Sequence, residues 1–181
     1  MKTDAIFIIT IIITLLCGCG KDDSGTTPTP VKQEDWTFPV NATRDSVTLY
    51  CEKQSVAVGE SFEVKIVLYN VSEIFGCAVE VQYASDKCEV TSGLAGTLFP
   101  ADSIIALPPK IESASNRVSY SVTKQRGTKS LSGSGIVFKM KCKAKTAGNA
   151  SFTINTATLE IRKADGLLVV RPVSNLSITV R

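Results

Sequence analysis

Apolar and polar residues alternate with a period of two along most of the chain after residue 44. The alternation is most regular in one segment near the middle of the chain. Its inward set is Ile136, Phe138, Met140, Cys142 and Ala144, and its outward set is Val137, Lys139, Lys141, Lys143 and Lys145. Successive side chains of a β-strand point to opposite faces of the sheet. The pattern therefore predicts a strand with one buried face and one wet face.

The same period marks segments near residues 47–52, 62–69, 77–83 and 118–123, and shorter strands are expected near 151–154, 159–161 and 176–180. Clusters of turn-forming residues separate these segments, at 84–87, 108–109, 132–135, 147–149 and 164–166. Many short strands with regularly spaced turns are typical of a β-sandwich. We therefore expect residues 44–181 to form one all-β domain, an antiparallel sandwich of two sheets.

The N-terminus has the pattern of an export signal. Lys2 precedes an apolar run over residues 5–16, which is shorter than the ~20 residues that a membrane-spanning helix needs. A charged start, a short apolar core and small residues behind it are typical of a secretory signal peptide. Plain secretion, or a helix that stays in the membrane, is the alternative.

Behind the apolar run, Leu16-Cys17-Gly18-Cys19 resembles a bacterial lipobox, with Gly18 as the small residue before an acylated Cys19. This predicts a signal peptide over residues 1–18. Residues 19–43 would be a lipidated, proline-containing tether. The following Lys21-Asp22-Asp23 resembles the tract that directs some lipoproteins to the cell surface. We expect a chain anchored by lipid to the outer membrane and exposed at the surface, with the periplasmic face as the alternative.

The composition excludes several chemistries. The 181 residues contain no histidine, so no Ser-His-Asp triad and no imidazole-bound zinc is possible. Twenty Lys and Arg against 17 Asp and Glu give a net charge of +3, too balanced to indicate nucleic acid. Most carboxylates fall in turns or on outward strand positions, with no facing pair of the kind that glycosidases use. The sequence favours a binding module that is not an enzyme and has no metal site and no cofactor.

Four cysteines remain beyond the predicted signal peptide and lipidation site, and each has the inward parity of its strand. They are Cys51, Cys77, Cys88 and Cys142. No CxxC spacing suggests a metal site. An exported protein permits disulfides, yet scattered core thiols fit the pattern equally well. The pairing of these cysteines stays open.

Several stretches of residues 44–181 together resemble the cohesin domain, the β-sandwich receptor module of cellulosome scaffolds. They occur in the order of that family and read VAVGESFEV (56–64), GCAVEVQY (76–83), CEVTSG (88–93), RVSYS (117–121), SGSGIVFKM (132–140) and ADG (164–166). The chain departs from the family at Ala84, where Asp is frequent, and at Cys88, where Leu is usual.

The resemblance implies a flattened jelly roll of about nine strands, whose first and last strands are neighbours. It also implies a protein partner, a small calcium-loaded helical module called a dockerin, so that the calcium belongs to the partner. In this family one sheet faces the dockerin. By position, the partner-binding residues here would be Glu80, Gln82, Asp86, Ser119, Ser121 and Thr123. An ordinary solvated sheet face is the alternative interpretation of the same residues.

The opposite sheet carries a second candidate site. Tyr50 and Tyr69 have outward parity with Val67 close by, and exposed aromatic rings are what sugar-stacking surfaces use. Cross-strand packing of the tyrosines is the alternative. The row of lysines from Lys139 to Lys145 has the charge to attract acidic glycans; alternatively it is a solvated stripe that protects a sheet edge and pairs in part with Glu63.

Together these observations predict a non-catalytic, surface-anchored module that holds a dockerin-like partner in polysaccharide degradation. Direct carbohydrate binding and a role as a surface adhesin are the alternative functions.

Overall fold

The computed structural model describes residues 46–169 and 171–181. The predicted signal peptide, Cys19 and the whole predicted tether lie outside these residues. Within the described part, no helix is long and apolar enough to cross a membrane. The strands are β1 (Val47–Tyr50), β2 (Ser55–Val56), β3 (Ser61–Tyr83), β4 (Cys88–Ala95), β5 (Ile104–Glu112), β6 (Arg117–Lys124), β7 (Leu131–Ala144), β8 (Gly148–Ile154), β9 (Glu160–Lys163), β10 (Val173–Ser174) and β11 (Leu176–Val180).

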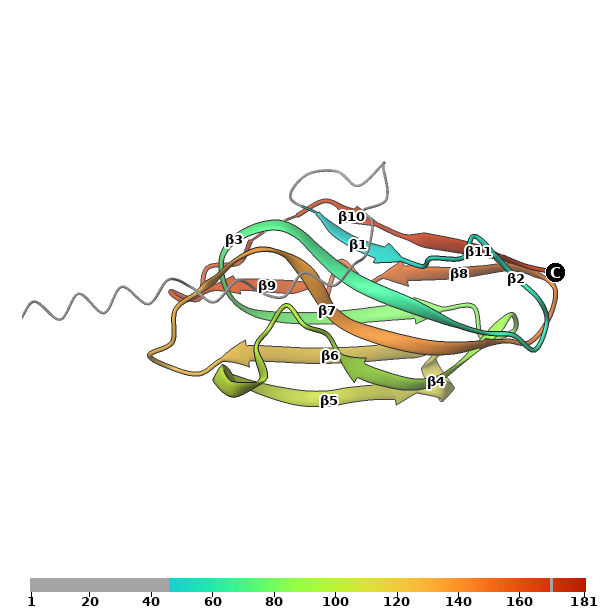
Figure 1. Ribbon diagram of the computed structural model, residues 1–181, viewed down its shortest axis with the longest axis horizontal. Helices are drawn as coiled ribbons and strands as arrows, with labels where there is room; N and C mark the ends of the chain where they lie inside the picture. The colour runs from blue at the N-terminus through green and yellow to red at the C-terminus, as the bar shows by residue number, and fades with distance from the viewer. Residues whose placement is uncertain (1–45, 170) are drawn as a thin grey trace, which may run out of the picture.

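The strands form two layers that share the long strand β3 (Figure 1). The first half of β3 pairs with β1 and β7, which gives a sheet with the order β10-β1-β3-β7-β4. The second half pairs with β6 on one side and with β9 and β8 on the other. Edge strand β5 extends this second sheet beyond β6, and β11 and β2 extend it beyond β8. We call the two layers the β7 sheet and the β6 sheet.

Strand β3 changes sheets at a kink near its middle. Asn70 and Glu73 both have left-handed backbone angles, with φ of 49° and 56°. Their backbone N–H groups donate to the hydroxyls of Ser134 at 2.8 Å and Ser132 at 3.0 Å. These serines of β7 therefore stabilise the kink by satisfying backbone donors that a regular ladder would have paired.

The first and last strands are parallel neighbours, as the resemblance to the cohesin domain implied. Val47 pairs with Val173 between β1 and β10, and Val56 pairs with Val180 between β2 and β11. When β1 is counted with β2 and β10 with β11, the number of strands is the expected nine. The antiparallel two-sheet sandwich predicted from the alternation is confirmed.

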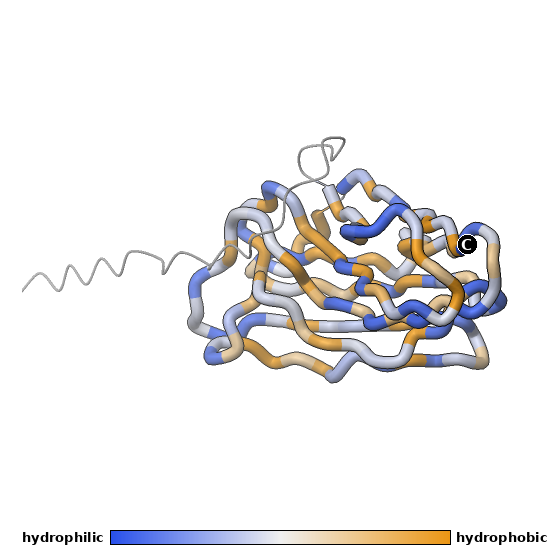
Figure 2. Tube along the Cα trace, turned by 45° about the vertical axis from the view of Figure 1, so that its right-hand side comes forward, coloured by the Kyte–Doolittle hydropathy of each residue, from blue (hydrophilic) through white to orange (hydrophobic). Residues whose placement is uncertain are grey.

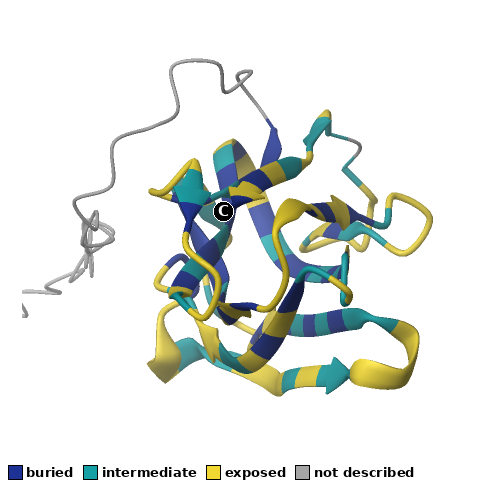
Figure 3. Cartoon of the chain, turned by 90° about the vertical axis from the view of Figure 1, so that its right-hand side faces the viewer, coloured by how far each residue is buried: buried dark blue, intermediate teal, exposed yellow. Residues whose placement is uncertain are grey.

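The core lies between the two sheets and is aromatic at its centre. Phe62 packs edge-to-face on Phe152, with ring centroids 6.2 Å apart, and Tyr120 contacts Phe138 at 5.3 Å. Apolar and polar segments alternate along the strands in Figure 2, and buried and exposed residues alternate in Figure 3. Each fully buried Phe or Leu side chain contributes about 1.5–3 kcal/mol of transfer free energy.

A β-bulge interrupts the alternation that predicted β7. Ile66 pairs with Phe138, but the next residue of β3, Val67, pairs with Ile136, so Val137 is the extra residue. Val137 therefore joins the main core, contrary to its predicted outward parity. Ile136, predicted to point inward, instead packs with Val67 in a small second cluster that Tyr50 covers.

Two predicted turns are strand residues instead. Pro108 and Pro109 lie within β5, at an irregularity of its pairing with β6. Proline is tolerated there because β5 is an edge strand and the register shift leaves no ladder bond to lose. The segment 132–135 lies within β7, where Ser132 and Ser134 hold the kink of β3.

All four described cysteines are buried and free, so no disulfide links them. Burial raises the pKa of the Cys77 thiol to about 12 and, as the main cause, that of Cys88 to about 11. Burial likewise raises the pKa of Cys51 and Cys142. These thiols act as small core side chains, as their inward parity predicted.

Candidate functional site

The outer surface of the β6 sheet is built from β5, β6 and β3 in register. Strand β9 flanks the first two rows, and β8 with the residue after it flanks the other two. Ile105, Thr123, Gly76 and Arg162 form one row across these strands, and Leu107, Ser121, Ala78 and Glu160 form the next. A third row contains Lys110, Ser119, Glu80 and Asn155, and a fourth contains Glu112, Arg117, Gln82 and Thr153. We call these four rows the binding face.

The first two rows form a trough, because small residues in the middle lie between large ones at the sides. Two shallow depressions, of about 290 Å³ and 340 Å³, meet at Ala78 and Ser121, which line both. Gly76 keeps the floor low: a Cβ there would stand 3.3 Å from the hydroxyl of Thr123. The trough is open enough to accept an elongated side-chain row of another molecule.

One wall of the trough is apolar. Ile105 is 62% exposed and Leu107 is 66% exposed, both on β5. Exposure of large aliphatic side chains to water is unfavourable, and burial of these side chains against a partner lowers the free energy of the complex. The sequence did not predict this wall. Pro108 and Pro109 are typical of a turn, and apolar and polar residues do not alternate along β5.

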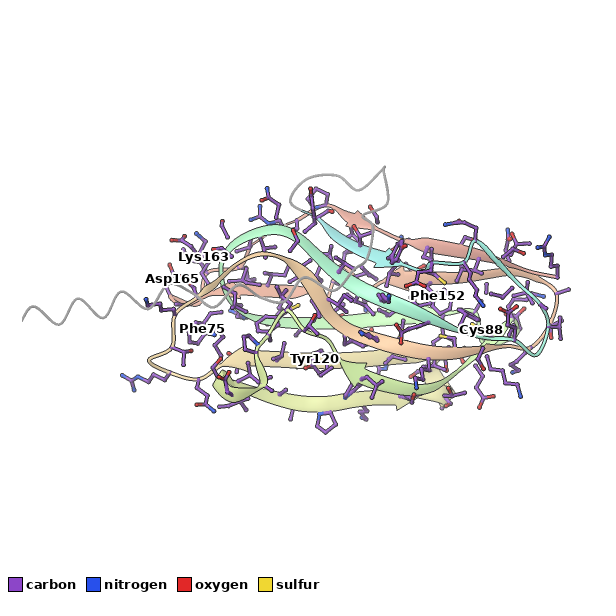
Figure 4. All side chains as sticks on the ribbon, in the orientation of Figure 1. Phe75, Cys88, Tyr120, Phe152, Lys163 and Asp165 are labelled. Atoms are coloured by element: carbon purple, nitrogen blue, oxygen red, sulfur yellow. The ribbon has the colours of Figure 1, made fainter. Side chains whose placement is uncertain are left out.

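The other wall is polar and closed on itself. Arg162 donates to the Glu160 carboxylate at 2.9 Å and to the Gly166 carbonyl at 3.0 Å. Lys163 bonds Glu73 at 2.9 Å across the same end of the sandwich. Figure 4 shows Lys163, Asp165 and Phe75 gathered at this end. Because Arg162 and Lys163 already pair with groups of the fold, this wall contributes to a partner's binding site mainly through its shape and less through its charge.

The third and fourth rows contain a chain of charges. Arg117 bonds Glu112 through Nε and Glu80 through Nη1, the latter at 3.3 Å, and Lys110 also pairs with Glu112. Hydrogen bonds from Lys110 and Arg117 hold the pKa of Glu112 at about 2, below its ordinary 4.5. Glu80 accepts a second hydrogen bond, from Asn155 Nδ2 at 2.7 Å. Its side chain is only 13% exposed. The main role of Glu80 is therefore to stabilise the fold through Arg117 and Asn155.

The structure brings together five of the six residues predicted to bind a partner. Ser119 lies opposite Glu80, Gln82 is in the row above, and Ser121 and Thr123 follow on β6. The sixth, Asp86, lies in the turn after β3 and pairs with Lys87 at 3.4 Å. That turn hydrogen-bonds to β8 and to the end of β7, so Asp86 is set apart from the four rows.

The candidate sugar-stacking surface on the β7 sheet loses one of its members. Val67 was expected at the surface, but it is 1% exposed because it packs against Ile136 beneath Tyr50. Tyr50 itself is half-buried in the same contact. Tyr69 is half-buried as well. The tyrosines therefore do not frame a flat apolar platform with Val67.

Metal and acid–base chemistry find no support in the described residues. No group of three His, Cys, Asp or Glu side chains there could hold a metal ion. The carboxylates of the binding face, Glu80, Glu112 and Glu160, are each bonded to a cation. Beside these ion pairs, the face presents the hydroxyls of Ser119, Ser121 and Thr123 and the apolar side chains of Ile105 and Leu107.

These features define a two-sheet sandwich of the jelly-roll class with an open contact face. The profile of the cohesin domain matches residues 47–180. No curated protein matches the chain.

Solved structures of cohesins are similar in fold. A type II cohesin domain from the cellulosome of Acetivibrio cellulolyticus gives a TM-score of 0.65 at 14% identity, over 75% of this chain and 95% of that one. A non-cellulosomal cohesin from the archaeon Archaeoglobus fulgidus gives 0.61 at 18%, over 77% and 92%. The sixth cohesin of scaffoldin B from A. cellulolyticus, solved with a Cel5 dockerin, gives 0.62 at 18%, over 77% and 100%. The chain belongs to the cohesin domain family.

Proposed function

We propose that this chain is a non-catalytic receptor whose binding face holds a dockerin-like helical module. The observation that carries the proposal is the trough between the apolar β5 wall and the Arg162–Glu160 wall, on a chain that belongs to the cohesin family. Structural relatives were solved in complexes with dockerins, which supports a partner of that class. Calcium in such a complex belongs to the partner.

The shape of the trough suggests how a helix binds there. An amphipathic helix docks through apolar residues spaced three or four apart. Its apolar stripe covers Ile105 and Leu107, and its polar flank meets the hydroxyls of Ser119, Ser121 and Thr123. Contact with Ile105 and Leu107 removes apolar surface from water at roughly 25 cal/mol per Å². The hydroxyls then fix the register of the helix by hydrogen bonds.

Anchoring is the second half of the proposal. Acylation of Cys19 ties the sandwich to the outer membrane through the tether of residues 19–43. A receptor on a tether confines its partner to a thin layer at the cell surface and raises its effective concentration there. A partner that carries a polysaccharide-degrading enzyme would then release sugars next to the cell. This is the role that we propose for the chain in polysaccharide breakdown.

A capture experiment tests the receptor function. The chain with Cys19→Ser is immobilised and exposed to the secreted proteins of its own cell, and bound proteins are released with EDTA. We expect a protein with a duplicated acidic calcium loop, and we expect Leu107→Arg to abolish its capture. Leu94→Arg is the matched control, because Leu94 is 48% exposed on β4, outside the binding face.

Three other results would each contradict the proposal. The first is capture that survives both EDTA and Leu107→Arg, which would indicate the alternative of an adhesin that binds by another surface. The second is equal loss in the Leu107 and Leu94 variants. The third is retention of the chain on insoluble neutral polysaccharide without any protein partner, which would favour a carbohydrate-binding module.

A further inference from the structure

Strand β7 carries a row of lysines on the outer surface of the β7 sheet, away from the binding face. Lys139, Lys141, Lys143 and Lys145 occupy alternate positions, and the last three are exposed. Alternate residues of a strand are about 6.6–6.8 Å apart. The row is therefore a straight line of positive charge about 20 Å long.

Protection of a sheet edge does not explain the row. β7 is an interior strand, paired with β3 on one side and β4 on the other. Lysines that prevent edge-to-edge association belong on edge strands. Pairing with Glu63 does not explain it either, because Glu63 forms its ion pair with Lys65 at 3.9 Å.

Among the neighbouring carboxylates, those of Glu52, Glu60 and Glu63 pair with other lysines, whereas Glu89 lies directly opposite Lys143. Lys65 also forms an ion pair with Glu52, at 2.7 Å, and Lys53 forms one with Glu60. In residues 46–169 and 171–181, no carboxylate forms an ion pair with Lys141 or Lys143. Lys145 donates to the backbone carbonyl of Ser85 at 2.9 Å and keeps its charge. Lys141, Lys143 and Lys145 outnumber the two carboxylates beside them, Glu63 and Glu89, so a net positive charge remains along this line.

The flanks of the row limit what can bind it. Lys141 lies between Glu63 on β3 and Ser92 on β4, and Lys143 lies between Ser61 and Glu89. The flanking strands are about 4.8 Å away on each side. A planar anionic membrane, or a duplex, would bring its negative charges over Glu63 and Glu89 as well as over the lysines. A single polymer chain laid along β7 meets the lysines and avoids both glutamates.

We infer that the lysine row binds a linear acidic polysaccharide, with carboxylates of the sugar chain on Lys141, Lys143 and Lys145. The serine hydroxyls of Ser61 and Ser92 lie beside the row, within the reach of sugar hydroxyls. Single-stranded nucleic acid would stack its bases on aromatic side chains, and the neighbours of Lys141 and Lys143 contain none. Because the row and the binding face are on opposite sheets, the chain holds a polysaccharide and a protein partner together.

Binding to polygalacturonate, measured at low and at physiological salt, tests the inference. The full chain with Cys19→Ser is compared with Lys141→Gln/Lys143→Gln in that background. The matched control is Arg126→Gln/Lys129→Gln, which removes two exposed charges from the loop between β6 and β7. We expect binding that weakens with salt, a loss on the order of tenfold in the Lys141/Lys143 variant, and little change in the control. Neutral dextran should not bind.

Three results would overturn the inference: no binding to polygalacturonate, equal losses in the two double variants, or unchanged binding in the Lys141/Lys143 variant. If the chain bound vesicles of phosphatidylcholine and phosphatidylglycerol but did not bind polygalacturonate, the lysine row would be assigned to a membrane. That result would also overturn the inference. Thermal unfolding of each variant separates lost binding from lost fold. The capture of a protein partner is measured separately, so its failure would leave this result intact.

Discussion

Leu107 of β5 lies directly opposite Ser121 of β6, so that a two-thirds-exposed aliphatic side chain borders the lowest part of the binding face. The pair sets the cross-section of the trough: Leu107 makes the wall and Ser121 makes the floor. A partner must therefore fill the floor and contact the wall at once. This relationship gives the first prediction.

Ser121→Leu should weaken partner binding and leave the fold intact. The longer side chain fills the point at which the two depressions meet. The serine hydroxyl forms no hydrogen bond with residues 46–169 or 171–181 that the substitution would remove. We expect the dissociation constant to rise by about tenfold or more, since a clash at the centre of an interface costs at least ~1.4 kcal/mol. Calorimetric titration with the captured partner measures it. Ser177→Leu, at an exposed position of β11, should bind normally; if it also fails, the trough is not the contact.

Glu80→Ala should destabilise the sandwich. Removal of the carboxylate leaves Arg117 and Asn155 without the acceptor that joins β6 to the segment after β8. We expect a loss of about 1–3 kcal/mol in the free energy of unfolding, measured by urea denaturation. Gln82→Ala, on the same strand but exposed, should cost less than about 0.5 kcal/mol. Equal costs would show that the Glu80 network contributes nothing.

Glu112 should make the stability of the fold depend on acid pH. Its folded pKa of about 2 is below its ordinary 4.5, because Lys110 and Arg117 bond the charged form. A group with a depressed folded pKa stabilises the native state above the unfolded pKa. That contribution is lost as the pH falls from about 4.5 towards about 2. The melting temperature of Glu112→Gln should therefore fall less steeply over this range than that of the parent chain; parallel curves would rule the effect out.

Val137→Ala should be costly although the alternation places Val137 outside. The bulge turns this side chain into the main core, where it is 2% exposed. Loss of two buried carbons and the cavity that they leave should cost about 2 kcal/mol. Denaturant unfolding measures it, with Lys141→Ala as the neighbouring surface control. A cost no larger than that of the control would mean that β7 has no bulge.

The four core thiols should be inert in the folded chain. Burial raises the pKa of Cys77 to about 12 and that of Cys88 to about 11, and reaction with a disulfide reagent requires the thiolate. At pH 8 we expect no reaction of Cys51, Cys77, Cys88 or Cys142 until the chain is unfolded in guanidinium. The mobility of the chain with and without reductant should be the same. Rapid labelling of the native chain would contradict their burial.

The sequence predicted the layers of this fold well because β3, β6, β7 and β8 alternate cleanly. Alternation reports which face is buried, and it does so even where a kink joins two expected strands into one. It fails at a bulge, because one inserted residue reverses the parity on one side of it relative to the other. Ile136 and Val137 exchanged roles for this reason, whereas the residues from Phe138 onward kept the predicted parity.

The binding face was predicted only in part. The serines of β6 and the polar residues of β3 have outward parity. Parity can be predicted from each strand's own sequence, without knowledge of its neighbours in the sheet. The apolar wall depends on β5, whose Pro108 and Pro109 read as a turn when their pairing partner is unknown. Asp86 follows β3 as expected, but its distance from the four rows depends on the path of the chain after β3. Hydrogen bonds to distant strands set that path, and no local pattern encodes them.

The parallel contacts at the two ends of the described chain have a mechanical consequence. Val47 and Arg181 lie towards opposite poles of the sandwich, because β1 runs beside β10 and β2 beside β11 in the same direction. A pulling force applied at Val47 and Arg181 therefore acts along these strands. The backbone hydrogen bonds of both contacts are then loaded in shear, so they resist the force together. In a hairpin pulled apart from one end, by contrast, the hydrogen bonds would break one after another.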